Sequence, residues 1–200
     1  MTEAEKSLPA GDPRAAEVLR FWFGSGETSG DRRKHWFGKD GAFDAQIRSR
    51  FMALHEEAAA GLLTRWNDDA QSCLALIVLL DQFSRNIFRA SARAFAADAL
   101  ALETARHAVA RGYDTGMRPV ERMFVYLPFE HGESLADQQR SCELMQPLDA
   151  FAETDDAYRY ALRHREIIER FGRFPHRNAV LGRVSTAQES EYLKQPGSRF

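Results

Sequence analysis

Apolar residues recur along this chain at the spacing of helices. One stripe at 3.6-residue spacing is formed by Phe43, Ile47, Phe51 and Leu54. Residues 74–80, LALIVLL, are apolar around the whole circumference of a helix, which is typical of a buried helix. No stretch shows the alternation of a strand between turns. The pattern therefore predicts an all-α fold with short connections, in which consecutive helices pack as antiparallel hairpins.

Capping residues, glycines and prolines divide the chain into about seven to eight predicted helices. Asp12 followed by Pro13 is a helix start, and Thr186 with Glu189 is a capping box. The predicted helices cover residues 13–23, 43–60, 69–88, 92–110, 119–127, 135–146, 156–171 and a short stretch after 186. Residues 25–34 are expected to form an exposed loop.

Length and composition indicate one globular domain. The 200 residues are 44% hydrophobic and 28% charged, and we expect a domain at 12–194 with flexible tails at 1–11 and 195–200. The net charge of −2 gives no general attraction for nucleic acid or an anionic membrane, and no apolar run is long enough to span a bilayer. The polar N-terminus and the two cysteines in apolar patterns, Cys73 and Cys142, predict a cytoplasmic protein.

A stripe of polar side chains, DQFSRNIFR, directly follows the apolar run. At 100° per residue, Asp81, Arg85 and Arg89 lie within about 80° of one another. Gln82 and Asn86 extend that arc. Buried charges need partners, so the stripe is either the floor of a ligand pocket or an internal network in which Asp81 pairs with Arg85.

A carboxylate–histidine cluster lies in LPFEHGES, after Pro128 is expected to end a helix. Glu130 and His131 are candidates for acid–base catalysis, supported by Glu133. His164, on the apolar face of its own helix, points toward the core and is a second supporting residue. The metal-binding spacings HExxH and Glu-x-x-His are absent, so we expect neither a metal nor another cofactor.

The segment ERFGRFPHRN, residues 169–178, concentrates arginines around a predicted turn. Gly172 suits a helix C-terminus, and Pro175 prevents the helix from continuing. The predicted ligand-binding residues here, with one from the following LGR, are Arg173, His176, Arg177, Asn178 and Arg183. Converging guanidinium groups suit a phosphate or carboxylate, although they can also neutralise the acidic residues of the two preceding motifs.

Six motifs, in this order, resemble the domain of unknown function 924 family of bacterial proteins. They are VLRFWFG, HWFGKDGAFD, LIVLLDQFSRNIFR, FVYLPFEH, RFGRFPHRN and LGRVSTAQESEYL. The resemblance covers about residues 13–193 and implies a tetratricopeptide-like α–α superhelix whose signature positions include the polar residues above. It implies no activity. Gly132 departs from the family pattern, in which serine is expected, so the resemblance supports no hydroxyl role there.

Three functions are compatible with these features. The first is binding of a small anionic ligand, a phosphate or carboxylate, in a polar pocket, with acid–base or hydrolytic chemistry as an extension. The second is a protein-interaction module that binds a peptide or its carboxylate. The third is a purely structural network of salt bridges. The sequence leaves open whether the protein is an enzyme and what its oligomeric state is.

Overall fold

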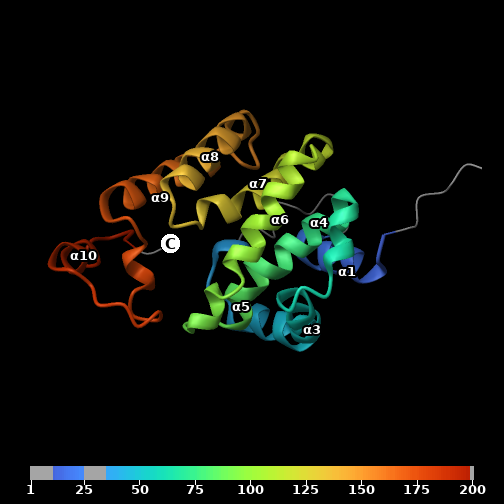
Figure 1. Ribbon diagram of the computed structural model, residues 1–200, viewed down its shortest axis with the longest axis horizontal. Coiled ribbons are helices and arrows are strands. Elements are labelled where there is room, and N and C mark those ends of the chain that lie inside the picture. The colour runs from blue at the N-terminus through green and yellow to red at the C-terminus, as the bar shows by residue number, and fades with distance from the viewer. Residues whose placement is uncertain (1–10, 25–34, 199–200) are drawn as a thin grey trace, which may run out of the picture.

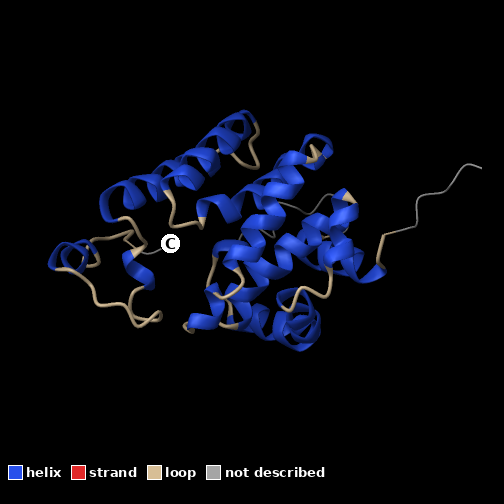
Figure 2. Cartoon of the chain, in the orientation of Figure 1, coloured by secondary structure: helices blue, strands red, loops and turns tan. Residues whose placement is uncertain are grey.

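The chain folds into helices joined by short connections. The computed structural model describes residues 11–24 and 35–198, and within these residues there are nine α-helices and no strand (Figures 1 and 2). The helices are α1 (Pro13–Phe23), α3 (Gly41–Ala59), α4 (Ala70–Ile77), α5 (Ser84–Ile87), α6 (Asp98–Ala110), α7 (Pro119–Glu130), α8 (Leu135–Met145), α9 (Ala157–Phe171) and α10 (Ala187–Tyr192). The predicted all-α class is confirmed.

Capping signals in the sequence correspond to real helix ends. The Asp12 side chain accepts a hydrogen bond from the N–H of Arg14 at the start of α1. Thr186 and Glu189 form the expected capping box of α10. Gly172 ends α9 with φ 68°, a left-handed conformation that glycine adopts without strain.

The core forms around α4, which is buried along nearly its whole length. This helix packs against α1, α6 and α7. Aromatic rings fill the space between these helices: the Trp22 ring lies 5.6 Å from that of Phe83 and 5.5 Å from that of Phe124. Trp36 is buried too, but Phe37 remains 57% exposed, so the core excludes the last member of the HWF motif.

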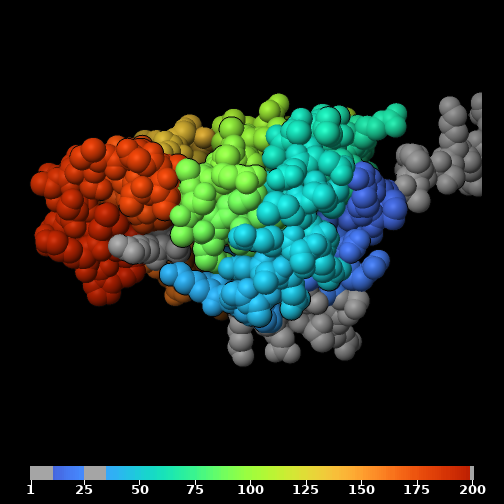
Figure 3. Space-filling view, turned by 90° about the horizontal axis from the view of Figure 1, so that it is seen from below, coloured from blue at the N-terminus to red at the C-terminus, as the bar shows by residue number. Residues whose placement is uncertain are grey.

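Consecutive helices from α6 to α9 pack each on the next. Beyond α9, the C-terminal residues, coloured red, gather at one end of the molecule (Figure 3). Pairwise packing is what helix hairpins require, whereas the tetratricopeptide-like superhelix stays a prediction.

Two predicted helix boundaries were wrong. α7 continues through Pro128 to Glu130, because a proline close to the end of a helix removes only one backbone hydrogen bond and residues 123–130 are buried. The helix expected from residue 92 begins at Asp98, after a separate 3₁₀ turn at Ala92–Phe95. An alanine-rich sequence does not distinguish these two helix types.

The predicted tails and loop fall mainly outside the described residues. This holds for residues 1–10, 25–34 and 199–200. Residues 195–198 lie against α9, where the Arg163 guanidinium donates a hydrogen bond to the carbonyl oxygen of Gly197 at 3.0 Å.

Candidate functional site

Asp81 lies in a π-helical turn within the buried helix. Residues Val78–Phe83 form this wider turn between α4 and α5, and Asp81 itself has no solvent exposure. A π-turn shifts the phase of the residues that follow it, and such turns are frequent at functional sites. The periodicity of the sequence predicts a regular helix here, and the π-turn differs from that prediction.

A carboxylate–histidine dyad joins the π-turn to the end of α7. His131 Nδ1 lies 2.7 Å from Asp81 Oδ1. Burial alone would raise the pKa of Asp81, but the Arg85 guanidinium and His131 bring it below its ordinary value, so the carboxylate only accepts hydrogen bonds. His131 Nδ1 therefore carries the proton and donates it. Nε2 keeps a lone pair, and no described residue forms a hydrogen bond with it.

Two arginines share one carboxylate beside this Asp81–His131 dyad. Arg85 Nη1 lies 3.0 Å from an oxygen of Asp81 and 3.0 Å from an oxygen of Asp98. Arg177 Nη1 lies 3.4 Å from the other oxygen of Asp98 and donates to the carbonyl oxygen of His131 at 3.1 Å. The side chains of His131 and Arg85 are 15% and 21% exposed, so the cluster reaches the surface.

Arg177 is the most enclosed of the cationic groups. Its side chain is 7% exposed, and its guanidinium packs on the rings of Phe95 and Phe174 at 4.8 and 4.5 Å. Burial, followed by repulsion from Arg85, lowers the pKa of Arg177 to about 10, so it remains charged at neutral pH. Its Nε is buried and has no hydrogen-bond partner among the described residues.

The family of the chain is decided by comparison with known proteins. The family described as "Bacterial protein of unknown function (DUF924)" matches residues 18–197. This chain belongs to the DUF924 family. It is 44% identical to the protein of unknown function ATU0120 from Agrobacterium tumefaciens, whose solved structure aligns with 92% of this chain and 98% of its own chain at a TM-score of 0.83. No curated protein matches this chain.

In this DUF924 protein a second carboxylate–histidine pair lies next to the dyad. Glu130 Oε1 lies 3.1 Å from Nδ1 of His164, which also donates to the carbonyl oxygen of Tyr160 at 2.9 Å. Burial, followed by the charge of Asp81, raises the pKa of Glu130 to about 8, and burial lowers the pKa of His164 to about 3. The rings of His164 and His131 are 6.4 Å apart. The two predicted acid–base residues thus have different partners.

The predicted polar stripe divides between two sites. Gln82 donates to Asp81 at 2.6 Å and so belongs to the dyad. Asn86 and Arg89 instead bind Asp44 on α3, Asn86 at 2.7 Å and Arg89 through two hydrogen bonds of 2.6 and 2.8 Å. Asn86 and Arg89 therefore connect α5 to α3, away from His131.

The arginine-rich segment divides in the same way. Arg173 forms two hydrogen bonds with Glu189, at 2.6 and 2.8 Å, and Asn178 donates to Ser185 at 3.0 Å. These contacts connect the segment to the residues that follow it. The His176 ring lies 5.6 Å from that of Phe174. Of the residues predicted in this segment, Arg177 alone contacts a residue of the dyad through a hydrogen bond given above.

Glu133 and Arg183 form a clasp between the C-terminal segment and the α7–α8 connection. The two side chains pair through hydrogen bonds of 2.6 and 2.9 Å. Glu133 also accepts a hydrogen bond from the backbone N–H of Phe174 at 2.8 Å. The clasp thus holds the segment that carries Arg177 against the end of α7.

Several polar partners in the DUF924 chain are not among the residues predicted from the sequence. Asp98 bridges Arg85 and Arg177, and Gln138 of α8 donates to the carbonyl oxygen of Glu130 at 2.6 Å. Asp98 lies in the first turn of α6, but the predicted helix began at residue 92, and the partners of Asp98 are 13 and 79 positions away. Nothing in the local pattern of Gln138 distinguishes it from an exposed glutamine.

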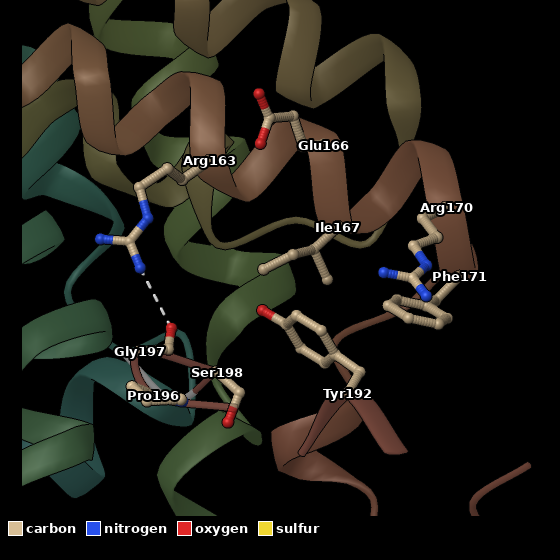
Figure 4. Close-up of a pocket in the computed structure, with 9 residues that line it drawn as sticks. All are labelled: Arg163, Glu166, Ile167, Arg170, Phe171, Tyr192, Pro196, Gly197 and Ser198. Carbon is tan, nitrogen blue, oxygen red and sulfur yellow. Dashed lines mark hydrogen bonds between the residues drawn. The ribbon is translucent and has the colours of Figure 1, made fainter. Parts of the chain in front are cut away.

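A groove of about 320 Å³ lies elsewhere, between α9 and the residues after α10 (Figure 4). It is lined by Arg163, Glu166, Ile167, Arg170, Phe171, Tyr192, Pro196, Gly197 and Ser198. None of the predicted site residues is among them. The Arg170 guanidinium lies over the Phe171 ring at 4.7 Å, at one end of the groove.

Membrane-spanning helices and metal-binding clusters are both absent from the described residues. No helix within them has the length and apolar character needed to cross a bilayer. No group of three or more histidine, cysteine, aspartate or glutamate side chains in that part of the chain is arranged to hold a metal ion.

Proposed function

We propose that this DUF924 protein binds a small anionic ligand, a phosphate ester or a carboxylate, beside His131. The observation that carries the proposal is the 2.7 Å contact between His131 and the fully buried Asp81. A buried carboxylate that fixes the tautomer of a partly exposed histidine leaves the other ring nitrogen available as a base. Burial, together with Arg85, also lowers the pKa of His131, which keeps the ring neutral at pH 7.

Arg85 and Arg177 would hold the anion. Each guanidinium already binds a carboxylate, that of Asp98, which indicates the kind of group the pair accepts. An anion beside them would lie next to His131, where Nε2 can take a proton from the ligand or from a water molecule. We therefore propose His131 as the base and Asp81 as the residue that orients it. Acid–base or hydrolytic chemistry is the extension of this proposal.

A thermal-shift screen tests the proposal. The panel contains phosphate esters, acetate, short dicarboxylates and sulfate. A ligand at 100 times its Kd stabilises the folded state by about 2.7 kcal/mol, and we expect at least one anion class to raise Tm. His131→Gln and Arg85→Gln should abolish the shift. Arg89→Gln, one residue beyond Phe88 at the end of α5 and bound to Asp44, should keep it.

Equal shifts in the wild type and in His131→Gln would contradict the proposal, and so would the absence of a shift with every anion. Circular dichroism at the assay temperature shows whether each variant is folded before its shift is interpreted. The Arg89 variant shows whether a lost shift results from loss of the site or from loss of any nearby arginine.

A second candidate function, peptide binding, is favoured by the groove between α9 and the residues after α10. The groove combines an apolar floor at Ile167 with the guanidinium of Arg170 at one end, a combination that suits a peptide with a free carboxylate (Figure 4). Peptides with free C-termini in the same screen distinguish the two functions. A shift lost in Arg170→Ala but retained in His131→Gln would favour the groove.

A further inference from the structure

The buried carboxyl group of Glu130 has an oxygen without a partner. Glu130 Oε2 is buried and makes no hydrogen bond with any described residue, and the same holds for Oε1 of Gln138. Gln138 lies against Glu130, because its Nε2 donates to the backbone oxygen of Glu130 at 2.6 Å. Both unpartnered atoms are acceptors. A proton on Glu130 removes the buried charge, whereas a carboxylate would leave a charged oxygen, Oε2, buried without a hydrogen-bond donor.

The titratable groups around Glu130 come from several elements. Asp81 in the π-turn and Asp156 before α9 both oppose a negative charge on it, in addition to burial. On α9, His164 is neutral at pH 7 because burial lowers its pKa to about 3. On α8, burial raises the pKa of the Cys142 thiol, so it carries no charge either. No positive charge among these groups favours ionisation of Glu130.

Between about pH 3 and pH 8, the Glu130 carboxyl is protonated and the His164 ring is neutral, so the pair carries no net charge. Glu130 holds its proton up to about pH 8, and His164 gains a second one only at about pH 3. Between these two pH values the proton therefore stays on the Glu130 carboxyl, and the pair loses it as Glu130 ionises near pH 8.

We propose that Glu130 and His164 form a buried proton store that sets the charge beside the Asp81–His131 dyad. Loss of the proton from this pair places a negative charge on Glu130, which is adjacent to His131 in the chain and near Asp81. That charge favours the protonated form of His131 and repels an incoming anion. A charge several ångströms away in a partly buried site changes affinity by about tenfold. The effect on anion binding rests on the proposed function, but the coupling to His131 does not.

The coupling is measured by NMR of the histidine ring nitrogens between pH 5 and pH 9.5. In the wild type we expect the His131 signals to show an inflection near pH 8, caused by ionisation of Glu130. Glu130→Gln should remove it, because glutamine imitates the protonated carboxyl and cannot titrate. Glu103→Gln, which changes an exposed glutamate on α6, should retain it. An inflection that persists in Glu130→Gln would overturn the proposal.

Sulfate and acetate are the ligand probes, because their charges stay constant between pH 7 and pH 9. Wild-type affinity should be about tenfold weaker at pH 9, and Glu130→Gln should bind equally well at both pH values. If neither probe nor any anion of the screen binds while the inflection near pH 8 is present, the proposed function fails and the coupling stands. Glu130→Gln should also fold normally at pH 7. Severe destabilisation would overturn the proposal, since it would mean that the native group is a carboxylate.

Discussion

At the scale of single residues, Asp81 determines the state of its neighbours. Its oxygens contact His131, Arg85 and Gln82, and removing them from water is tolerable only while these partners are in place. The pairing with Arg85, one turn on, could be predicted from helix geometry and is confirmed. The contact with His131, 50 positions away, could not, because helical periodicity says nothing about which helices meet.

Asp81→Asn should destabilise the protein by about 3 kcal/mol or more at pH 7, because it leaves Arg85 without one of its two carboxylate partners in a buried place. The folded-state pKa of Asp81 lies below its unfolded value, so its contribution is present above about pH 4 and is lost as the pH falls further. Urea denaturation from pH 2 to pH 7 measures this. The variant should lose stability less steeply than the wild type in the acidic range.

The exposed Asp149 provides the control for this measurement. Asp149→Asn removes an exposed carboxyl and should change the free energy of unfolding by less than about 0.5 kcal/mol. Parallel pH curves for Asp81→Asn and the wild type would mean that Asp81 does not titrate differently in the folded state, contrary to the electrostatics of the dyad.

At the scale of helices, the sequence predicted what is encoded locally. Caps such as Asp12 and the glycine that ends α9 act on the adjacent helical turn. The position of such a helix end can therefore be predicted from a few neighbouring residues. The continuation of α7 past Pro128 depends on burial of the surrounding residues by other helices. The π-turn at Val78–Phe83 has no local signature either, and it was missed although it carries Asp81.

Gly172→Ala should cost about 1 kcal/mol of stability, because residue 172 has φ 68° and an L side chain is strained there. No atom lies within 4 Å of an added methyl group, so the cost is one of backbone conformation alone. Gly41→Ala, in the first turn of α3 and equally unobstructed, should be neutral or slightly stabilising. Equal effects of the two substitutions, measured by urea denaturation, would contradict this explanation.

At the scale of the whole molecule, contacts between distant segments decide which predicted residues form a site. The polar motifs were expected to converge, and the structure brings together Asp81, Arg85, His131 and Arg177. Several others, among them Asn86, Arg89 and Arg173, serve separate connections, because each binds a carboxylate that the local pattern does not reveal. For Arg89 this carboxylate is Asp44, 45 positions earlier in the chain.

The clasp between Glu133 and Arg183 should hold Arg177 in place for the site. In a double-mutant cycle with Glu133→Gln and Arg183→Gln, we expect a coupling energy of about 1 kcal/mol, as for a two-pronged, partly buried ion pair. If the effects of the two single substitutions on the free energy of unfolding sum to that of the double variant within about 0.3 kcal/mol, the ion pair contributes no coupling energy to stability.

The clasp also connects stability to binding. The Arg177 guanidinium lies between the rings of Phe174 and Phe95. The backbone N–H of Phe174 donates a hydrogen bond to Glu133, and Phe95 belongs to the 3₁₀ turn before α6. If the clasp positions Arg177, then Arg183→Gln should weaken sulfate binding and increase amide hydrogen exchange in residues 173–183, while the NMR signals of the His131 ring stay unchanged. If sulfate affinity is unaffected although exchange increases, Arg85 rather than Arg177 holds the anion. A change in the His131 signals would instead mean that the clasp supports the dyad itself.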